Sequence, residues 1–100
     1  MEFNGVVSVR GVTANDRKQP IKGQTEDCLR QIEALLTSAG TDKTKLLTST
    51  VYLSNMQDKD GMNAVWRAWL APDVKPTRAT IQAQLGTSET LIEIVVSAAK

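Results

Sequence analysis

The run Leu91-Ile92-Glu93-Ile94-Val95-Val96-Ser97-Ala98-Ala99 is strongly apolar and predicts a β-strand. Successive side chains of a strand point to opposite faces, so Leu91 and Val95 share one face while Ile92, Ile94 and Val96 share the other. A sheet with helices on one side normally has a polar second face. Apolar residues on both faces of this run therefore predict a sheet that is buried on both sides.

Two further segments show the three- and four-residue steps of helices. The first begins near Ile21, and Gly40 follows it at the position where a left-handed residue ends a helix. The second follows Asp58, which we expect to cap it. The buried faces are predicted to consist of Cys28, Leu29, Ile32, Leu35, Leu36 and Ala39 in the first helix, and of Met62, Val65, Trp66, Trp69 and Leu70 in the second.

Three more segments predict strands: residues 6–9, 46–53 and 77–84. In the last of these, Ala79 and Ile81 alternate with Arg78 and Thr80. The polar residues 13–20 predict a surface loop. The order β-α-β-α-β-β predicts one α+β domain over residues 1–100, with two helices on one face of a mixed or antiparallel sheet. Two helices cover only one face, so we expect the other to meet another subunit. The alternative is a loosely covered edge strand.

The composition excludes several classes of function. With 100 residues, one Cys and no His, the chain cannot form a Ser-His-Asp triad, a Cys-His pair or a His-ligated zinc site. Cys28 predicts a buried structural thiol and suits a reducing compartment. A net charge of +1 gives no footprint for nucleic acid or an anionic membrane. The start of the chain lacks a signal-peptide pattern, so we expect a cytoplasmic protein.

Two charged residues are candidates for chemistry. Glu93 interrupts the apolar run, where a carboxylate must be paired, solvated or functional. Arg78 offers a planar fork that binds a carboxylate through two hydrogen bonds. The pattern alone also allows a structural Arg78–Glu93 salt bridge.

Several segments, in this order, resemble one known family: Val9-Arg10-Gly11, residues 24–40, residues 50–56, Met62-Asn63-Ala64-Val65-Trp66-Arg67-Ala68-Trp69, Pro76-Thr77-Arg78-Ala79 and Ile92-Glu93-Ile94. Over residues 5–99 the chain resembles the reactive intermediate deaminase family, also called YjgF or RidA-like. The resemblance implies a chorismate-mutase-like (ferredoxin-like) sandwich. It also implies a homotrimer around a barrel-like core, with a ligand cleft at each subunit interface.

The same resemblance implies hydrolysis of reactive enamines and imines such as 2-aminoacrylate to 2-keto acids and ammonia, without a metal or organic cofactor. It makes Arg78 the clamp for the substrate carboxylate and Glu93 the group that orients or activates water. The backbone around Gly11 and Val12 would help to bind ligand or water. Asn63 and Trp66 match positions near the cleft, although the spacing of Trp66 also suits the core.

Differences from the family pattern predict a short subgroup. Arg10 and Val12 flank Gly11 where Ser or Thr is common, Thr80 stands at a frequent Cys position, and Gly86-Thr87 replaces a Leu-Pro pair. We also expect the chain to begin after a segment that carries a cleft tyrosine in active members. The alternative function is therefore a non-catalytic binder of small carboxylate metabolites in the same cleft. RNA cleavage, attached to some members, is disfavoured by the neutral charge and the lack of His.

Overall fold

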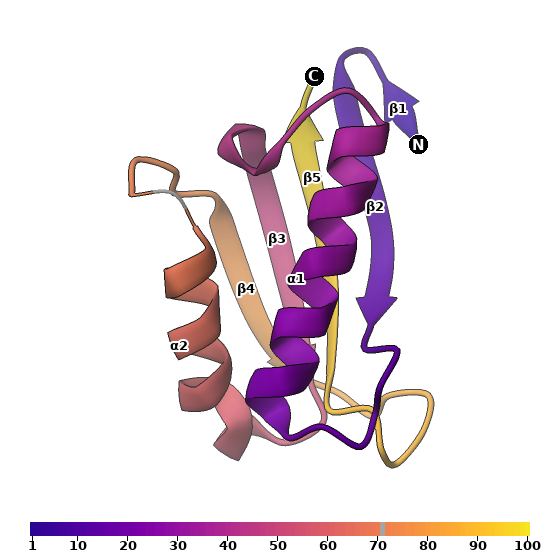
Figure 1. Ribbon diagram of the computed structural model, residues 1–100, viewed down its shortest axis with the longest axis vertical. Helices are drawn as coiled ribbons and strands as arrows, with labels where there is room; N and C mark the ends of the chain where they lie inside the picture. Colours follow the sequence, from indigo (N-terminus) through magenta and orange to yellow (C-terminus); the bar gives the residue numbers. More distant parts are fainter. Residues whose placement is uncertain (71) are drawn as a thin grey trace.

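The computed structural model describes residues 1–70 and 72–100 as a five-stranded sheet with two α-helices on one face (Figure 1). The elements are β1 (Glu2–Phe3), β2 (Val6–Thr13), α1 (Ile21–Ser38), β3 (Leu46–Leu53), α2 (Lys59–Trp69), β4 (Thr77–Gln82) and β5 (Ile92–Ala99), with 3-10 turns at Lys43–Lys45 and Met56–Asp58. Both ends of the chain lie at the same end of the molecule (Figure 1). The predicted fold class is confirmed.

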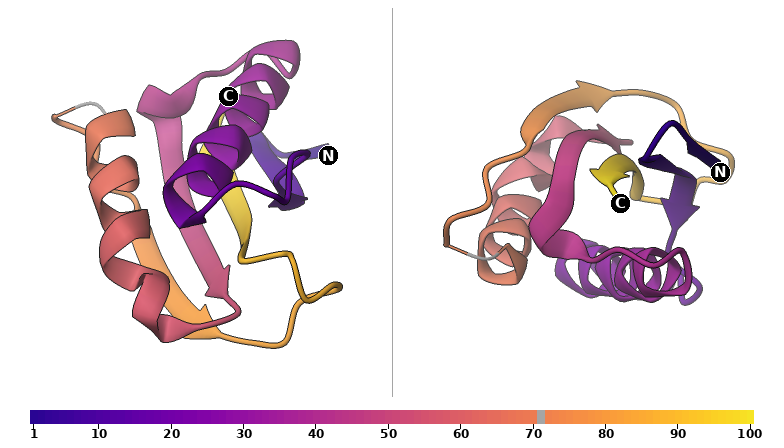
Figure 2. Two further views of the ribbon diagram at one scale, coloured as in Figure 1. Left: turned by 60° about the horizontal axis from the view of Figure 1, so that its bottom comes forward. Right: turned by 90° about the horizontal axis from the view of Figure 1, so that it is seen from above.

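The apolar run that opened the sequence is the centre of the sheet. The strand order is β1-β2-β5-β3-β4, with β3 and β4 parallel and the other pairs antiparallel. On β5, Ile92, Ile94 and Val96 are at most 2% exposed and face the helices, while the intervening residues are half-buried on the opposite, open face. The view from above in Figure 2 (right) shows both helices against one side of a twisted sheet.

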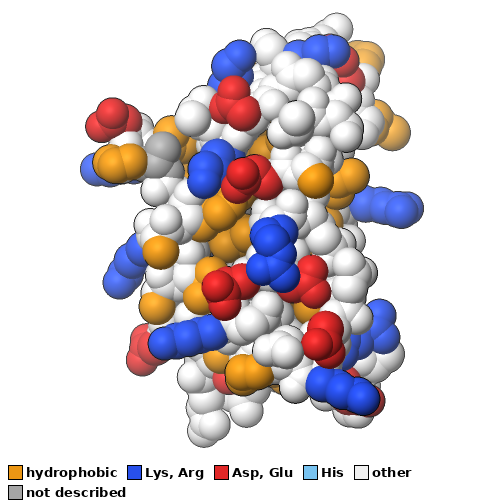
Figure 3. Space-filling model, in the orientation of Figure 1, with side chains coloured by type: hydrophobic (Ala, Val, Ile, Leu, Met, Phe, Trp, Pro, Cys, Tyr) orange, Lys and Arg blue, Asp and Glu red, His pale blue; other side chains and the backbone are white. Residues whose placement is uncertain are grey.

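The helices bury most of the predicted residues. Cys28, Leu29, Ile32 and Leu36 of α1 are buried, and so are Met62 and Trp66 of α2. Apolar atoms show in the seam between the helices, and charged side chains of both signs surround it (Figure 3). Residue 35 was predicted wrongly: Leu35 is 47% exposed, beside the β2 edge of the sheet.

The helix ends follow the sequence in part. Gly40 has a φ of +85°, and the N–H groups of Gly40 and Thr41 donate to the carbonyls of Thr37 and Leu36. These two bonds form the Schellman arrangement, so the predicted helix end is confirmed. Asp58 stands at the start of α2, but its side chain makes no capping hydrogen bond.

The strands differ from prediction at their ends. β2 extends beyond residue 9 to Thr13, whereas β4 ends at Gln82 rather than at residue 84. The short strand β1 was not predicted. It pairs with β2 through a turn at Asn4 and Gly5, which both have positive φ, as two-residue hairpins require.

Candidate functional site

Glu93 lies on the open face of the sheet, beside a bulge in β2. Val9 pairs with Val96 and Val12 pairs with Ile94, so two residues of β2, Arg10 and Gly11, share the space opposite one residue of β5. Such a bulge kinks a strand and redirects its side chains. The Glu93 carboxylate packs over Gly11, where a Cβ atom would lie only 2.6 Å from Oε2. The glycine therefore provides the space that this carboxylate occupies.

Arg78 lies on the other face. Its β4 position pairs with Ser49, which pairs with Val96 on the helix-covered side. The guanidinium Nη1 is 3.8 Å from the Met62 sulfur, and Cζ is 5.6 Å from the centre of the Trp66 ring. Burial, and secondly the positive charge of Arg67, lowers the pKa of Arg78. A guanidinium nevertheless stays protonated in proteins, so Arg78 is a partly buried cation.

One chain does not bring Arg78 and Glu93 together. They stand three residues and two strands apart in the sheet register, on opposite faces, with Cα atoms separated by roughly 14 Å. The ion pairs among the described residues are Lys43 with Glu33 and Lys100 with Glu2. The structural salt bridge that the sequence allowed is therefore not formed. We call Arg78, Met62 and Trp66 the arginine half-site, and Glu93 with Gly11 the glutamate half-site.

Asn63 follows Met62 on α2 and carries an unusual group. The residue is 8% exposed, and its Oδ1 is fully buried without a hydrogen-bond partner in the part of the chain that is described. Buried carbonyl oxygens are nearly always paired, so each exception calls for an explanation. An additional donor, from a ligand or from a second subunit, would satisfy this oxygen.

Val12 has a different environment from Gly11. Its side chain is 6% exposed and lies in the core, and its carbonyl accepts the Cys28 Sγ–H at 3.4 Å. Burial, and then the charge of Asp27, raises the pKa of Cys28 to about 12. Only the main chain of Val12 could therefore contribute to the predicted ligand site. The buried Cys28 is an unreactive thiol.

Gln24 is a positioning residue that sequence reasoning missed. Its side chain is fully buried at the start of α1. Nε2 contacts the carbonyls of Arg17, Gln19 and Glu89, and Oε1 accepts the N–H of Leu91. Gln24 thereby fixes both the loop after β2 and the approach to β5, two residues before Glu93. The sequence signal for this role was a polar residue, Gln24, on the side of the helix that carries the buried apolar residues.

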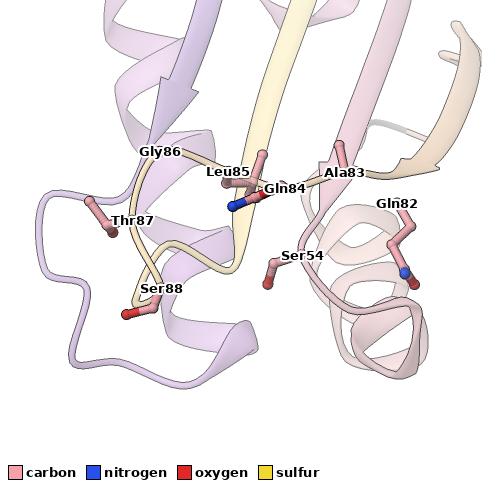
Figure 4. A pocket seen from close by; sticks show the side chains of 8 residues that line it. All are labelled: Ser54, Gln82, Ala83, Gln84, Leu85, Gly86, Thr87 and Ser88. Carbon is pink, nitrogen blue, oxygen red and sulfur yellow. The ribbon is translucent and has the colours of Figure 1, made fainter.

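A separate cavity of about 520 Å³ opens beside the loop after β4. Ser54 lies across from that loop (Figure 4). The rest of the lining is Gln82, the last residue of β4, and loop residues 83–88. None of the predicted site residues lines this cavity. Among the described residues, no group of three His, Cys, Asp or Glu side chains is placed to hold a metal ion, and no helix is long and apolar enough to cross a membrane.

Comparison with known sequences identifies the family. The pattern described as Endoribonuclease L-PSP matches residues 1–100. This chain belongs to that family. A RutC family protein of Haemophilus ducreyi is 38% identical over 97 residues, which cover 97% of this chain and 83% of that protein. The RutC family protein YoaB of Escherichia coli is 37% identical over 76 residues, covering 76% of this chain and 67% of YoaB.

Solved structures of L-PSP relatives agree with this assignment. A member of the YjgF protein family from Neisseria meningitidis superposes with a TM-score of 0.94 and 36% identity, covering 97% of this chain and 81% of that one. An uncharacterized protein from Pseudomonas aeruginosa gives a TM-score of 0.95 and 32% identity, covering 99% and 86%. The resemblance to the RidA/YjgF family that the sequence indicated is confirmed.

Proposed function

We propose that this protein hydrolyses reactive enamines and imines of 2-amino acids, such as 2-aminoacrylate, to 2-keto acids and ammonia. One observation carries the proposal: within residues 1–70 and 72–100, each chain presents a partly buried guanidinium without a carboxylate partner and, separately, a carboxylate held over a glycine. Family membership supports the same function.

The arginine half-site supplies substrate binding. The guanidinium can hold the carboxylate of a 2-imino acid through two parallel charge-assisted hydrogen bonds. Oδ1 of Asn63, which is buried and has no hydrogen-bond partner among the residues that the structure describes, can accept a hydrogen bond from the substrate N–H group. Two fixed points on a small substrate orient its imine carbon, and orientation alone can supply a large part of a rate enhancement.

The glutamate half-site supplies proton transfer. The enamine first takes a proton at C3 and becomes the protonated imine, which is already electrophilic. Water then adds to C2, and Glu93 accepts a proton from that water as the C–O bond forms. The amine of the resulting tetrahedral species is protonated and leaves as ammonia, and the C–N electrons depart with it while the carbonyl forms. Water is thereby the only co-reactant.

The two half-sites face opposite sides of one sheet, so we propose that Arg78 of one copy and Glu93 of a neighbouring copy form each cleft. The open face supports this assembly because it carries Val95, Tyr52 and the 44% exposed Ile81. A groove of about 500 Å³ between Leu35 and the β2 edge adds a second apolar surface. Three copies around a closed core would cover the open faces, and the site would be incomplete in a single chain.

The test generates 2-aminoacrylate in situ and follows 2-keto acid release with and without the protein. We expect acceleration that falls about a hundredfold or more in Arg78→Ala, because the clamp orients the substrate. Acceleration that survives Arg78→Ala unchanged contradicts the assigned role. Binding of a 2-keto acid without any acceleration would identify the non-catalytic carboxylate binder instead. Salt-sensitive RNA binding would point to nucleic acid. We propose the cytoplasm as the compartment, in keeping with the free Cys28.

A further inference from the structure

We propose that Trp66 is the positioning residue of the Arg78 clamp: it fixes the guanidinium for the ligand carboxylate without binding the ligand itself. This inference rests on the proposed role of Arg78. Trp66 of α2 lies in the hydrophobic core and is 4% exposed. The Cζ atom of Arg78 lies 5.6 Å from the centre of the Trp66 ring. A cation within about 6 Å of an indole face is held by the negative potential of the ring.

The partners of Arg78 suit a binding cation better than a structural one. Within the described residues, the guanidinium contacts the Met62 sulfur at 3.8 Å and the Trp66 ring, and no carboxylate pairs with it. A carboxylate partner would hold Arg78 but would compete with a substrate carboxylate for the same N–H donors. An aromatic face holds the planar group and leaves most of its in-plane donors available.

The Trp66 ring is itself held in place from α1. The Trp66 and Trp69 ring centres are 5.7 Å apart with planes tilted by 45°. Trp69 Nε1 donates to Glu33 Oε1 at 2.7 Å, and Lys43 lies 5.2 Å from the Trp69 ring centre. Contacts therefore run from α1 through both indoles to the guanidinium. Arg78 lies on an edge strand and would otherwise keep much of its rotamer freedom, which binding would have to remove.

A double-mutant cycle tests the proposal, with 2-ketobutyrate as the probe and calorimetry as the assay. The variants are Trp66→Leu, Trp66→Phe, Arg78→Ala and Trp66→Leu/Arg78→Ala. We expect the dissociation constant to rise in the order Trp, Phe, Leu at position 66, by roughly three- to tenfold in total. In the Arg78→Ala background, Trp66→Leu should have no further effect, because a residue that acts through Arg78 has nothing left to position.

The core variant Ile32→Val is the control for loss of packing, because Ile32 is fully buried in α1. It should lower the melting temperature and leave the dissociation constant unchanged. The NMR signals of the Arg78 side chain report directly on its position over the Trp66 ring. The ring current should shift these signals upfield in the wild type and not in Trp66→Leu. In the hydrolysis assay, Trp66→Leu should raise KM much more than it lowers kcat.

Any of the following results would overturn the proposal. Trp66→Leu could lower the affinity for 2-ketobutyrate equally with and without Arg78, it could leave that affinity unchanged, or Ile32→Val could lower the affinity as much as Trp66→Leu does. A wild-type Arg78 signal without a ring-current shift would also overturn it. This measurement does not depend on the variant, and if Trp66→Leu is too unstable to assay, Trp66→Phe replaces it in the cycle. Failure of the proposed function looks different. Carboxylate binding and the ring-current shift would persist, and imine hydrolysis would be absent.

Discussion

Replacing Gly11 with alanine displaces the Glu93 carboxylate, the group proposed to transfer protons, without altering its chemistry. The added Cβ would lie 2.6 Å from Oε2 of Glu93 and 2.8 Å from its carboxyl carbon. An ordinary contact needs at least about 3.4 Å, so the carboxylate has to recede by roughly 0.8 Å. The backbone of Gly11 is outside the left-handed region, so alanine introduces no φ strain there.

Stability and activity should therefore separate in Gly11→Ala. The crowded atoms are the mobile end of a side chain on the open face, so we expect the unfolding free energy to fall by about 1 kcal/mol or less. Displacement of a catalytic group by about 1 Å can cost as much as a hundredfold in rate. We therefore expect kcat for imine hydrolysis to fall about ten- to hundredfold, measured as keto-acid release, with the melting curve nearly unchanged.

Gly23→Ala is the matched control, since Gly23 lies in the first turn of α1 and its Cβ would meet Gln19 Oε1 at 2.7 Å, with all three nearest atoms belonging to Gln19. Its kcat should stay within about twofold of the wild type. Full activity in Gly11→Ala would refute the proposed placement of Glu93. A loss of activity in Gly11→Ala that persists undiminished in a Glu93→Gln background would also refute it, because the glycine would then act independently of the carboxylate.

Three further predictions concern the open face, the Asp27 carboxylate and the buried Cys28 thiol. Ile81→Asp places a charge on the 44% exposed apolar position of the open face. If the proposed three-subunit assembly forms through this face, sedimentation should show its mass for the wild type and the mass of a single subunit for the variant. Burial alone would raise the pKa of Asp27, but hydrogen bonds from Gln31 and from the N–H groups of Asp16 and Asn15 outweigh it and lower that pKa from 3.8. The stabilisation is therefore present above pH 3.8 and lost as pH falls through the lower folded value, so Asp27→Asn should reduce Tm by about 2–4 °C at pH 7 and have little effect near pH 2. Cys28, with its pKa raised to about 12 chiefly by burial, should react with a chromogenic disulfide at pH 8 only after unfolding; rapid labelling of the native protein would contradict its burial.

The elements were predictable wherever a pattern was long. Residues 46–53 form β3 as predicted, because β-branched and apolar residues continue across the whole strand. Leu35 shows the limit of such patterns. Helical periodicity places Leu35 on the side of α1 that faces the sheet. Leu35 is nevertheless exposed, because it lies beside the edge of the sheet at β2, and the sequence does not show where the sheet ends. The strand β1 is only two residues long, too short for any periodic signal, although Asn4-Gly5 marked the turn.

The site was predictable as residue types and not as an arrangement. Alternation correctly separated Arg78 from Ala79 and Ile81, and the usual rule would turn the apolar side toward the helices. The pairing of β4 with β3 instead turns the polar side of β4 toward the helices. Arg78 therefore faces α2, and Ile81 lies on the open face. The packing of Gly11 against Glu93 depends on a bulge, which alternating patterns do not encode.

Mixing two inactive variants tests the shared site most directly. Arg78→Ala and Glu93→Gln chains would be unfolded together in equal amounts, refolded and assayed for imine hydrolysis. If each cleft takes Arg78 from one copy and Glu93 from the next, random assortment leaves about one cleft in four with both native residues. We predict recovery of about a quarter of the wild-type rate. No recovery, although the refolded mixture is assembled and each variant still folds, would contradict a site built from two copies.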